Sequence, residues 1–444
     1  MVSPDIDSAV QITRLLTSQR DPNRLLEADR VAHDWYRFVL SFPPHLVRHY
    51  AEAFYRGDGT VLDPFCGTGT TVVEAKKLGI PSVGIEANPM AAFAAGVKVT
   101  WDIDQNAMWH QACGIAEAAS DILSSQGIQD QAGALFTAPA TSQLRRLPPE
   151  SEKLLLTNSI SPLPLHKALV LLECLEKAGP APFDGHLRLA LASTLVQDAS
   201  NLHFGPEVGV RGMKSDAPVI GPWLARVRQI QSDLATLSRD SATRARVLHA
   251  DSRNATALVP AASVEAVITS PPYPNEKDYT RTTRLESVML GFLRDKQQLR
   301  QMKQGLLRSN TRGVFRKDTD DEVVSDNATV ADLATEIERR RKELGKTSGF
   351  ERLYARLTKL YFGGMQRHLA GLRQILKPGA HLAYVVGDQA SYFRVLIRTG
   401  QILAEISRSL GYEVLGIDLF RTRISTTTRE QMREEVLLLR WPGA

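Results

Sequence analysis

Two short loops, about two hundred positions apart, constrain the fold of this chain more than any other feature. Residues 63–71 (DPFCGTGTT) follow a β-type run at 60–62, and residues 269–273 (TSPPY) follow another at 264–268. Both loops should therefore leave the carboxyl ends of strands, where open α/β sheets bind their ligands. The pattern predicts an α/β fold with a ligand site between the two loops.

The first loop has the residues that a nucleotide-like ligand needs. Gly67 and Gly69 allow a sharp turn and a close approach of the backbone, and Thr70 or Thr71 is expected to cap the helix that follows. Glu86 ends the next strand-like run, where a carboxylate can accept hydrogen bonds from both ribose hydroxyls. An ordinary strand-turn-helix with packing glycines is one alternative. A nicotinamide-binding loop is another, but it lacks its third glycine.

The second loop presents hydrogen-bonding groups beside a flat ring. Two consecutive prolines fix φ and remove two donors, which leaves the Ser270 hydroxyl and the Pro271 carbonyl in place. Tyr273 then offers a face on which a base can stack, worth roughly 1–3 kcal/mol. The alternative is a purely structural Pro-Pro turn whose tyrosine packs against the rest of the protein.

Together the two loops resemble those of the amino-methylating DNA methyltransferases, which carry an FxGxG loop and an (S/N/D)PPY loop. The serine version resembles the branch that acts on the exocyclic amino group of cytosine. The resemblance implies a class I methyltransferase sheet, mostly parallel with an antiparallel final strand, interrupted by large helical insertions. It also implies S-adenosyl-L-methionine as cofactor, double-stranded DNA as substrate, base flipping with direct transfer to N4, and a restriction-modification or genome-marking role beside a cognate restriction endonuclease.

The resemblance assigns roles to particular residues. Asp63 and the loop backbone would hold the amino-acid part of the cofactor, Glu86 the ribose, and Asp251, after the strand-like run 246–250, the adenine ring. Residues 33–38 (HDWYRF), followed by residues 41–47 (SFPPHLV), resemble the motif that closes over the methionine end, although the second run also fits a simple helix start. The implied catalytic residues are Ser270, Pro271, Pro272 and Tyr273. The implied cofactor contacts are Phe42, Pro43, Asp63, Pro64, Phe65, Cys66, Gly67, Thr68, Gly69, Thr70, Glu86 and Asp251.

Charge patterning indicates a surface for nucleic acid. The chain has a net charge of +5, and residues 294–317 contain eight basic residues and one acid. Such a stretch can follow a phosphate backbone, but the acidic residues at 318–322 could instead neutralise it. The connection between the last two strands, from Arg421 through Arg429 to Arg433, offers further cations. The expected DNA contacts are Tyr279, Arg281, Arg308, Arg312, Arg316, Arg421 and Arg423.

The scaffold pattern is interrupted twice. Runs of apolar residues at 154–156 and 168–175 predict that the first insertion, which is mostly helical, has a core of its own. We expect the two insertions to share target recognition. The expected division is 1–100 with the cofactor loop, 101–245 as the helical insertion, 246–293 with the SPPY loop, 294–350 as the charged insertion, and 351–444 as the end of the methyltransferase core.

Cysteine usage excludes one related chemistry. Methylation at carbon 5 of cytosine needs a Pro-Cys pair, and none of the three cysteines follows a proline. Their isolation fits a reducing cytoplasm and predicts no metal site. Because the chain has no run of about 18 apolar residues and its start lacks a basic region, a soluble cytoplasmic protein is expected. Two other functions stay open: an amino methyltransferase acting on adenine or on guanine in RNA, and a non-catalytic DNA-binding protein on the same scaffold.

Overall fold

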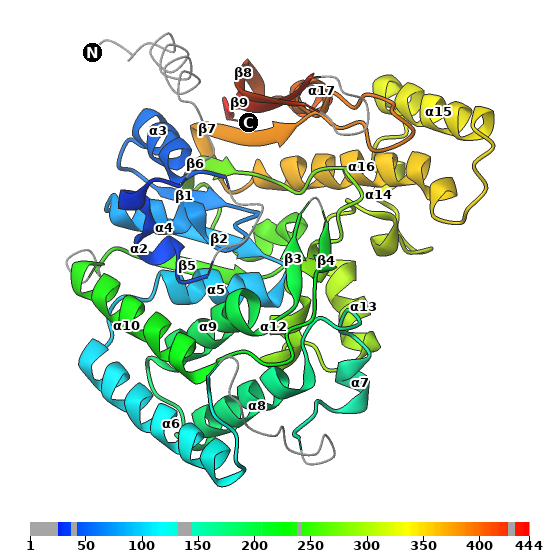
Figure 1. Ribbon diagram of the computed structural model, residues 1–444. Helices are drawn as coiled ribbons and strands as arrows, with labels where there is room; N and C mark the ends of the chain where they lie inside the picture. The colour runs from blue at the N-terminus through cyan, green and yellow to red at the C-terminus, as the bar shows by residue number, and fades with distance from the viewer. Residues whose placement is uncertain are drawn as a thin grey trace.

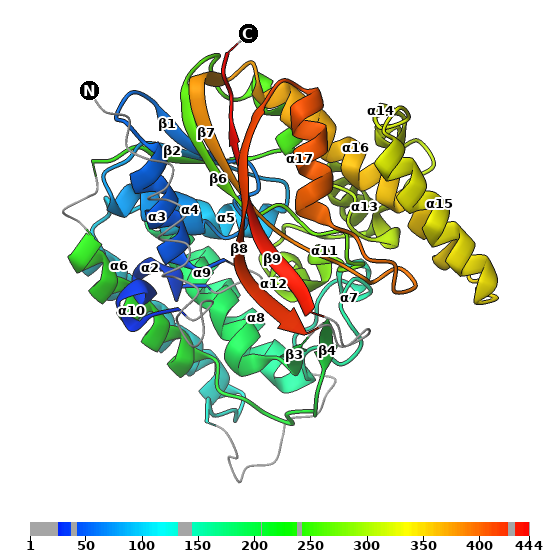
Figure 2. The same ribbon diagram turned by 90° about the horizontal axis from the view of Figure 1, so that it is seen from above.

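A seven-stranded sheet forms the centre of the computed structural model, which describes residues 25–36, 42–131, 144–205, 207–237, 242–424 and 431–443 (Figures 1 and 2). The strands are β1 (Thr60–Asp63), β2 (Ser82–Glu86), β5 (Ala245–His249), β6 (Val264–Thr269), β7 (Leu376–Gly387), β8 (Glu413–Ile424) and β9 (Gln431–Arg440). Their order is β5-β2-β1-β6-β7-β9-β8, with β9 antiparallel to both of its neighbours and the other pairs parallel. This is the class I methyltransferase arrangement that the sequence predicts.

The direction of strand order reverses between β1 and β6, which lie side by side in parallel register. In open α/β sheets, ligands bind outside the carboxyl ends of the strands at such a reversal. The two loops of interest leave β1 and β6 at this point. The sheet therefore brings together two segments that are far apart in the sequence.

Alternating strand residues bury both faces of the sheet. Val61, Ile268 and Val385 pack with α3 (Pro44–Phe54). Leu62 and Val267 pack on the opposite face with α16 (Tyr354–Leu372) and α17 (Thr399–Ser409). This period of two follows from the pleat of a strand. The remaining scaffold helices are α4 (Thr70–Lys77) and α5 (Pro89–Lys98).

The first insertion is mostly helical, as predicted, but the expectation of a separate core is wrong. One continuous apolar cluster joins Leu171 and Trp223 of the insertion to Val72 of α4 and Met90 of α5. The insertion therefore extends the scaffold below the β5 edge of the sheet (Figure 1). Its elements are α6 (Gln105–Ser125), α7 (Pro149–Glu152), α8 (Pro162–Lys177), α9 (Asp184–Thr194), the π-turn η3 (Leu195–Ala199), β3 (Leu202–Phe204), β4 (Val208–Val210) and α10 (Ile220–Leu237).

A short N-terminal segment is held against the scaffold by polar contacts. Its elements are η1 (Glu27–Asp29) and α2 (Arg30–His33). The imidazole of His33 lies 2.8 Å from Glu74 of α4, and the indole of Trp35 donates to Asp233 of α10 at 2.7 Å. The segment therefore joins the scaffold to the first insertion.

The second insertion begins after the SPPY loop and returns to the sheet through α16. Its elements are α11 (Tyr279–Thr282), α12 (Arg284–Met289), α13 (Lys296–Gly305), η6 (Thr311–Gly313), α14 (Asp320–Val323), α15 (Ala328–Glu343) and η7 (Glu351–Leu353). Two glycines of α16 admit α14: a Cβ on Gly363 would lie 1.7 Å from the Asp320 carbonyl oxygen, and one on Gly364 would lie 2.5 Å from Leu307. Side chains at these two positions would displace α14.

Helix α15 lies at the periphery of the molecule in both views (Figures 1 and 2). Its inner face buries Val330 and Ile337 in the apolar cluster that includes α16, and Arg339 forms ion pairs with Glu336 and Glu343 on its exposed face. Within the described part of the chain, no helix combines the length and apolarity that crossing a bilayer requires.

Candidate cofactor and base-binding site

Asp63 stands at the junction of β1 and β6. Its Oδ1 accepts hydrogen bonds from the Thr269 hydroxyl at 2.6 Å and from the Phe65 amide at 3.1 Å. The side chain is fully buried, and no hydrogen-bond partner of Oδ2 is found in the described residues. Burial raises the pKa of this carboxyl to about 6. A buried carboxylate oxygen of this kind needs a donor, preferably a cation.

The two glycines of the first loop have different tasks. Gly67 has φ +52° and would place a Cβ in open space, with nothing within 4 Å. Gly69 has φ +92°, and its Cβ would meet Ala95 of α5 at 3.0 Å. Gly67 therefore leaves space open at the edge of the sheet, whereas Gly69 lets α4 and α5 pack closely.

Two details of the first loop correct or refine the sequence analysis. Gly69, and not Thr70 or Thr71, is the N-cap of α4, and no side chain caps this helix. The Thr71 hydroxyl instead donates to the Ile268 carbonyl at 3.1 Å and so ties the loop to β6. Cys66 packs against Gly84, where an added Cβ would lie 2.8 Å from its sulfur, and burial raises the pKa of its thiol well above the usual value. It is therefore a packing residue.

Glu86 closes the first loop from β2. Its carboxylate accepts the amide of Gly67 at 2.9 Å and the amide of Asn88 at 2.7 Å. Burial raises the pKa of this carboxyl to about 7, and the charge of Asp63 also raises it. Two acids with raised pKa values at neighbouring strand ends form a site that favours a cationic ligand.

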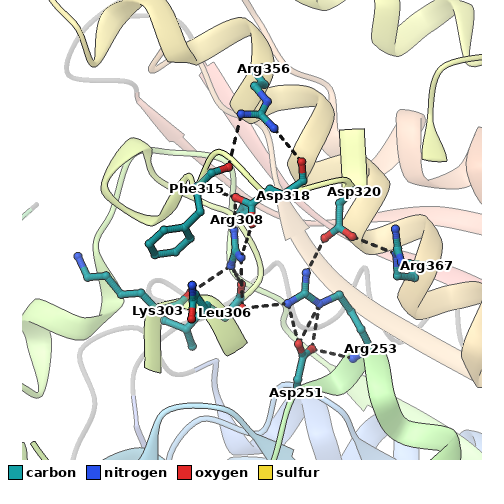
Figure 3. Close-up of polar contacts among 11 residues, drawn as sticks. Asp251, Arg253, Lys303, Leu306, Arg308, Phe315, Asp318, Asp320, Arg356 and Arg367 are labelled. Atoms are coloured by element: carbon teal, nitrogen blue, oxygen red, sulfur yellow. Dashed lines mark hydrogen bonds and ion pairs between the residues drawn. The ribbon is translucent and has the colours of Figure 1, made fainter. Parts of the chain in front are cut away.

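Asp251 follows β5 and completes a row of acids along the sheet edge. The amide of Ala250 donates to the Glu86 carbonyl at 3.0 Å, so the two loops are adjacent. The Asp251 carboxylate is held by Arg253, as Figure 3 shows. The ends of β1, β2 and β5 thus present Asp63, Glu86 and Asp251 in the order of the strands.

The other residues expected at the cofactor lie around these acids. Pro43 is the N-cap of α3, and Phe42 packs with the apolar cluster beneath that helix, as a simple helix start predicts. Residues 37–41 of this motif lie outside the described residues. The Phe65 ring meets His368 of α16 edge-on, with 4.8 Å between the ring centroids. Pro64 and Thr68 lie in the loop between β1 and α4, and Thr70 is the first residue of α4.

The second loop orients an acceptor beside an aromatic ring. The Ser270 hydroxyl donates to the Val385 carbonyl of β7 at 3.1 Å, so its oxygen acts as an acceptor, and it lies close enough to the Tyr273 hydroxyl to affect the pKa of that group. Tyr273 follows Pro271 and Pro272 and is half-buried. Gly387 leaves room for its ring, because a Cβ there would lie 3.1 Å from Tyr273 Cε2.

Tyr279 supports this turn. The amide of Tyr273 donates to the Tyr279 hydroxyl at 3.3 Å, and burial raises the pKa of Tyr279 to about 12. Tyr279 is one of the expected DNA contacts. Its hydrogen bond with the Tyr273 amide also gives this side chain a structural role.

The cations expected to contact DNA differ in how far they are already engaged. Arg308 is 5% exposed and binds both carboxylate oxygens of Asp318, at 2.8 and 2.9 Å. This finding favours the alternative in which the acidic cluster neutralises the arginine, and it argues against a contact between Arg308 and DNA. Arg312 and Arg316 are exposed.

The remaining cations lie near the second loop. Arg281 is 3.7 Å from Glu207 in the β3–β4 turn. Arg421 pairs with Glu434, and Arg423 donates to the Asp388 carbonyl at 3.1 Å. Arg429 lies outside the described residues.

Sequence comparisons agree with this geometry. Residues 16–95 match the DNA methylase family model N6_N4_Mtase, a range that includes β1, the first loop and Glu86. The type II methyltransferase M.BsoBI of Geobacillus stearothermophilus is 26% identical over 437 residues, which cover 90% of this chain and 82% of that protein. These similarities support a DNA methyltransferase.

Two shorter similarities point the same way. The type II methyltransferase M.AvaI of Nostoc is 30% identical over 194 residues, which cover 40% of this chain and 38% of that protein. The type II methyltransferase M.MjaII of Methanocaldococcus jannaschii is 32% identical over 73 residues, which cover 16% of this chain and 14% of that protein. The alignment with M.BsoBI spans most of this chain, insertions included.

The methyl donor that such an enzyme requires fits the residues present. The unpartnered Asp63 Oδ2 suits the ammonium group of S-adenosylmethionine, and the open space at Gly67 lies on the same loop. Glu86 and Asp251 offer acceptors for hydroxyl and amino donors. Local sequence patterns do not assign roles to Thr269, Val385, Gly387 and Arg253, because their partners lie in distant segments. The glycine after the apolar run 382–386 is a local signal for Gly387.

Proposed function

We propose that this protein is a site-specific DNA methyltransferase that transfers a methyl group from S-adenosylmethionine to the N4 amino group of cytosine. The observation that carries the proposal is the position of Ser270 directly after β6, where its hydroxyl donates to the Val385 carbonyl of β7. The preceding residue, Thr269, donates to Asp63 at the end of β1. This arrangement sets a hydrogen-bond acceptor for the target amino group next to the acids that suit a cationic donor.

Each loop has a separate task in the proposed reaction. Asp63 binds the amino-acid part of the cofactor, Glu86 the ribose and Asp251 the adenine. S-adenosylmethionine, when bound, supplies an electrophilic methyl group on a positively charged sulfur. Residues 63–70 form its binding loop, with Phe42 and Pro43 closing over the methionine end.

The second loop acts on the base. A base within a duplex must leave the stack before its amino group is accessible, at a cost of a few kcal/mol. Tyr273 offsets part of this cost by stacking. Ser270 Oγ and the Pro271 carbonyl accept the amino protons and turn the nitrogen lone pair toward the methyl group, while Pro272 keeps the turn rigid. Because the attack is direct, the chain needs no covalent nucleophile.

The two insertions, 101–245 and 294–350, are proposed to share recognition of the target sequence, and the segments 1–100, 246–293 and 351–444 to form the catalytic scaffold. Exposed Arg312 and Arg316, with Arg281, Arg421 and Arg423 near the second loop, are the proposed phosphate contacts. The type II methyltransferases to which this chain is similar suggest a restriction-modification setting, with a cognate endonuclease as partner.

Identification of the modified base tests the proposal. The protein is expressed in a bacterial host that lacks DNA methylation, and the genome is analysed by mass spectrometry of its nucleosides and by single-molecule sequencing. N4-methylcytosine at one short motif is the expected result, and a Tyr273→Ala host should show none. N6-methyladenine would replace the proposal with the adenine alternative. An unmodified genome, with cofactor bound by the purified protein, would favour the non-catalytic alternative.

A further inference from the structure

The guanidinium of Arg253 lies between the proposed adenine site and the second insertion (Figure 3). On one side it grips Asp251, with Nη2 at 2.6 Å from Oδ2 and Nε at 3.0 Å from each oxygen. On the other side Nη1 pairs with Asp320 of α14 at 2.5 Å, and Nη2 donates to the Gln304 carbonyl at 3.4 Å. A single side chain thus links two segments that are far apart in the sequence.

Asp320 is a fixed anchor for this link. Its other oxygen pairs with Arg367 of α16 at 3.0 Å, and the missing side chains of Gly363 and Gly364 let α14 pack directly on α16. The arginine is therefore held from the scaffold side as well as from the cofactor side.

The link is shielded from water. The exposed fractions of the Arg253, Asp320 and Asp251 side chains are 13%, 10% and 18%. Charge-assisted bonds in such a setting are stronger than those at the surface. Loss of the guanidinium would leave the Asp251 carboxylate without its cation and Asp320 with Arg367 alone.

The hydrogen bonds from Arg253 occupy most of the acceptor positions of the Asp251 carboxylate. A carboxylate has about four acceptor positions. Three hydrogens of Arg253 point at them, from the backbone amide at 2.9 Å, from Nε and from Nη2. About one position remains, which matches the single bond that an exocyclic amino group such as that of adenine can donate to one acceptor.

We propose that Arg253 is a positioning residue, which sets the orientation of Asp251 for the adenine amino group of the cofactor and is itself anchored by Asp320. The inference rests on the proposed function. Through Asp320, the start of α14 in the second insertion would then support the cofactor site. This role is separate from any contact that the insertion makes with DNA.

Binding of two stable product analogues tests this inference. S-adenosyl-L-homocysteine has the 6-amino donor, whereas S-inosyl-L-homocysteine has an oxygen acceptor in its place. By calorimetry, the unaltered protein should prefer the adenosyl compound by about 10- to 100-fold, the usual effect of one hydrogen bond to a charged group. Arg253→Met should lose most of that preference. Asp320→Asn should lose part of it, and the double variant should lose no more than Arg253→Met, because both residues act through one link.

Arg308→Met is the matched control. Arg308 also forms a bidentate pair with an aspartate, is 5% exposed, and lies with Asp320 in the second insertion. Among the described residues it bonds to Asp318 and to backbone carbonyls, and it shares only the Gln304 carbonyl with Arg253. It should lower the midpoint of thermal unfolding without changing the preference. If Arg253→Met does not fold, Arg253→Lys is used in its place, because lysine keeps the positive charge but lacks the planar set of donors of the guanidinium. This variant should also lose the preference for the adenosyl compound.

The outcomes separate the two proposals. A folded Arg253 variant that keeps the wild-type preference overturns the inference and leaves the proposed function intact. Failure of the unaltered protein to bind the adenosyl compound overturns the proposed cofactor site itself. An equal loss of preference in Arg308→Met would show a general loosening of the segment and would also overturn the inference.

Discussion

The hydroxyl of Ser270 donates to the carbonyl oxygen of Val385 at 3.1 Å, which links the last residue before the two prolines to the neighbouring strand β7. A serine whose proton is engaged in this way acts as an acceptor toward anything that enters the site. The acceptor is thus oriented before the base arrives, so little orientation entropy remains to be lost during the reaction.

Ser270→Ala should lower kcat for methyl transfer by about 10- to 100-fold, because one hydrogen bond to the reacting amino group is lost. Cofactor affinity, measured by calorimetry, should be unchanged. Ser263→Ala is the control, since that hydroxyl bonds to the Pro260 carbonyl near the other end of β6. Equal rates for the two variants would contradict the role of Ser270.

Gly67→Val should abolish binding of S-adenosylmethionine, because the added side chain would enter the open space beside the loop. Gly79→Val is a close control: Gly79 also has positive φ, +71°, and nothing within 4 Å, but it lies in the exposed turn between α4 and β2. Both variants carry a backbone penalty of about 1–2 kcal/mol. Calorimetry should show that only Gly67→Val loses the cofactor, and unchanged affinity in a folded Gly67→Val protein would disprove the assignment of this loop.

Cofactor affinity should depend on pH. Burial raises the pKa of Asp63 to about 6 and that of Glu86 to about 7, both above the unfolded values of about 4. At these two carboxyls the folded protein without cofactor therefore binds more protons than the unfolded chain, and their contribution to the free energy of unfolding falls as pH rises from about 4 to 7. Because a cationic cofactor favours ionised carboxylates, its addition should raise the unfolding midpoint more at pH 8 than at pH 5.5. A larger increase at pH 5.5 would contradict these assignments.

The salt dependence of DNA binding should separate the arginines of the charged segment. If Arg312 and Arg316 meet phosphates, replacing both with Gln should flatten the slope of log affinity against log salt by about 1.8, or roughly 0.9 for each contact. Arg308→Gln should leave the slope unchanged and lower the free energy of unfolding, since its partner is Asp318. Titration of fluorescent duplex DNA at several salt concentrations gives the slopes. An unchanged slope in the double variant would move the proposed DNA surface to the 101–245 insertion.

Local patterns predict the sheet well. The apolar run at 264–268 becomes β6, and the acids Asp63 and Glu86 stand at the ends of β1 and β2, as the sequence indicates. These features depend on neighbours in the chain, where periodicity and turn chemistry are informative. The mostly parallel sheet with an antiparallel final strand is implied by the resemblance and is confirmed.

Contacts between distant segments are what the sequence does not predict. Arg253 and Asp320 are 67 positions apart, and nothing in either local pattern pairs them. The adjacent Gly363 and Gly364 inside a helix are a signal of close backbone approach, but they do not identify the partner. The expected threonine cap failed because Gly69 adopts a left-handed conformation that only glycine adopts readily.

The bond between Thr269 and Asp63 spans 206 positions, and this separation has a consequence during protein synthesis. At about 5–20 residues per second, a ribosome makes the second partner roughly 10 to 40 s after the first. During this interval β1 can pair with β2, but its other edge has no β6 to pair with. An unpaired edge is open to wrong partners. The nascent chain therefore has an incomplete cofactor loop, and an edge available to chaperones or to other strands, until more than half of its length has been made.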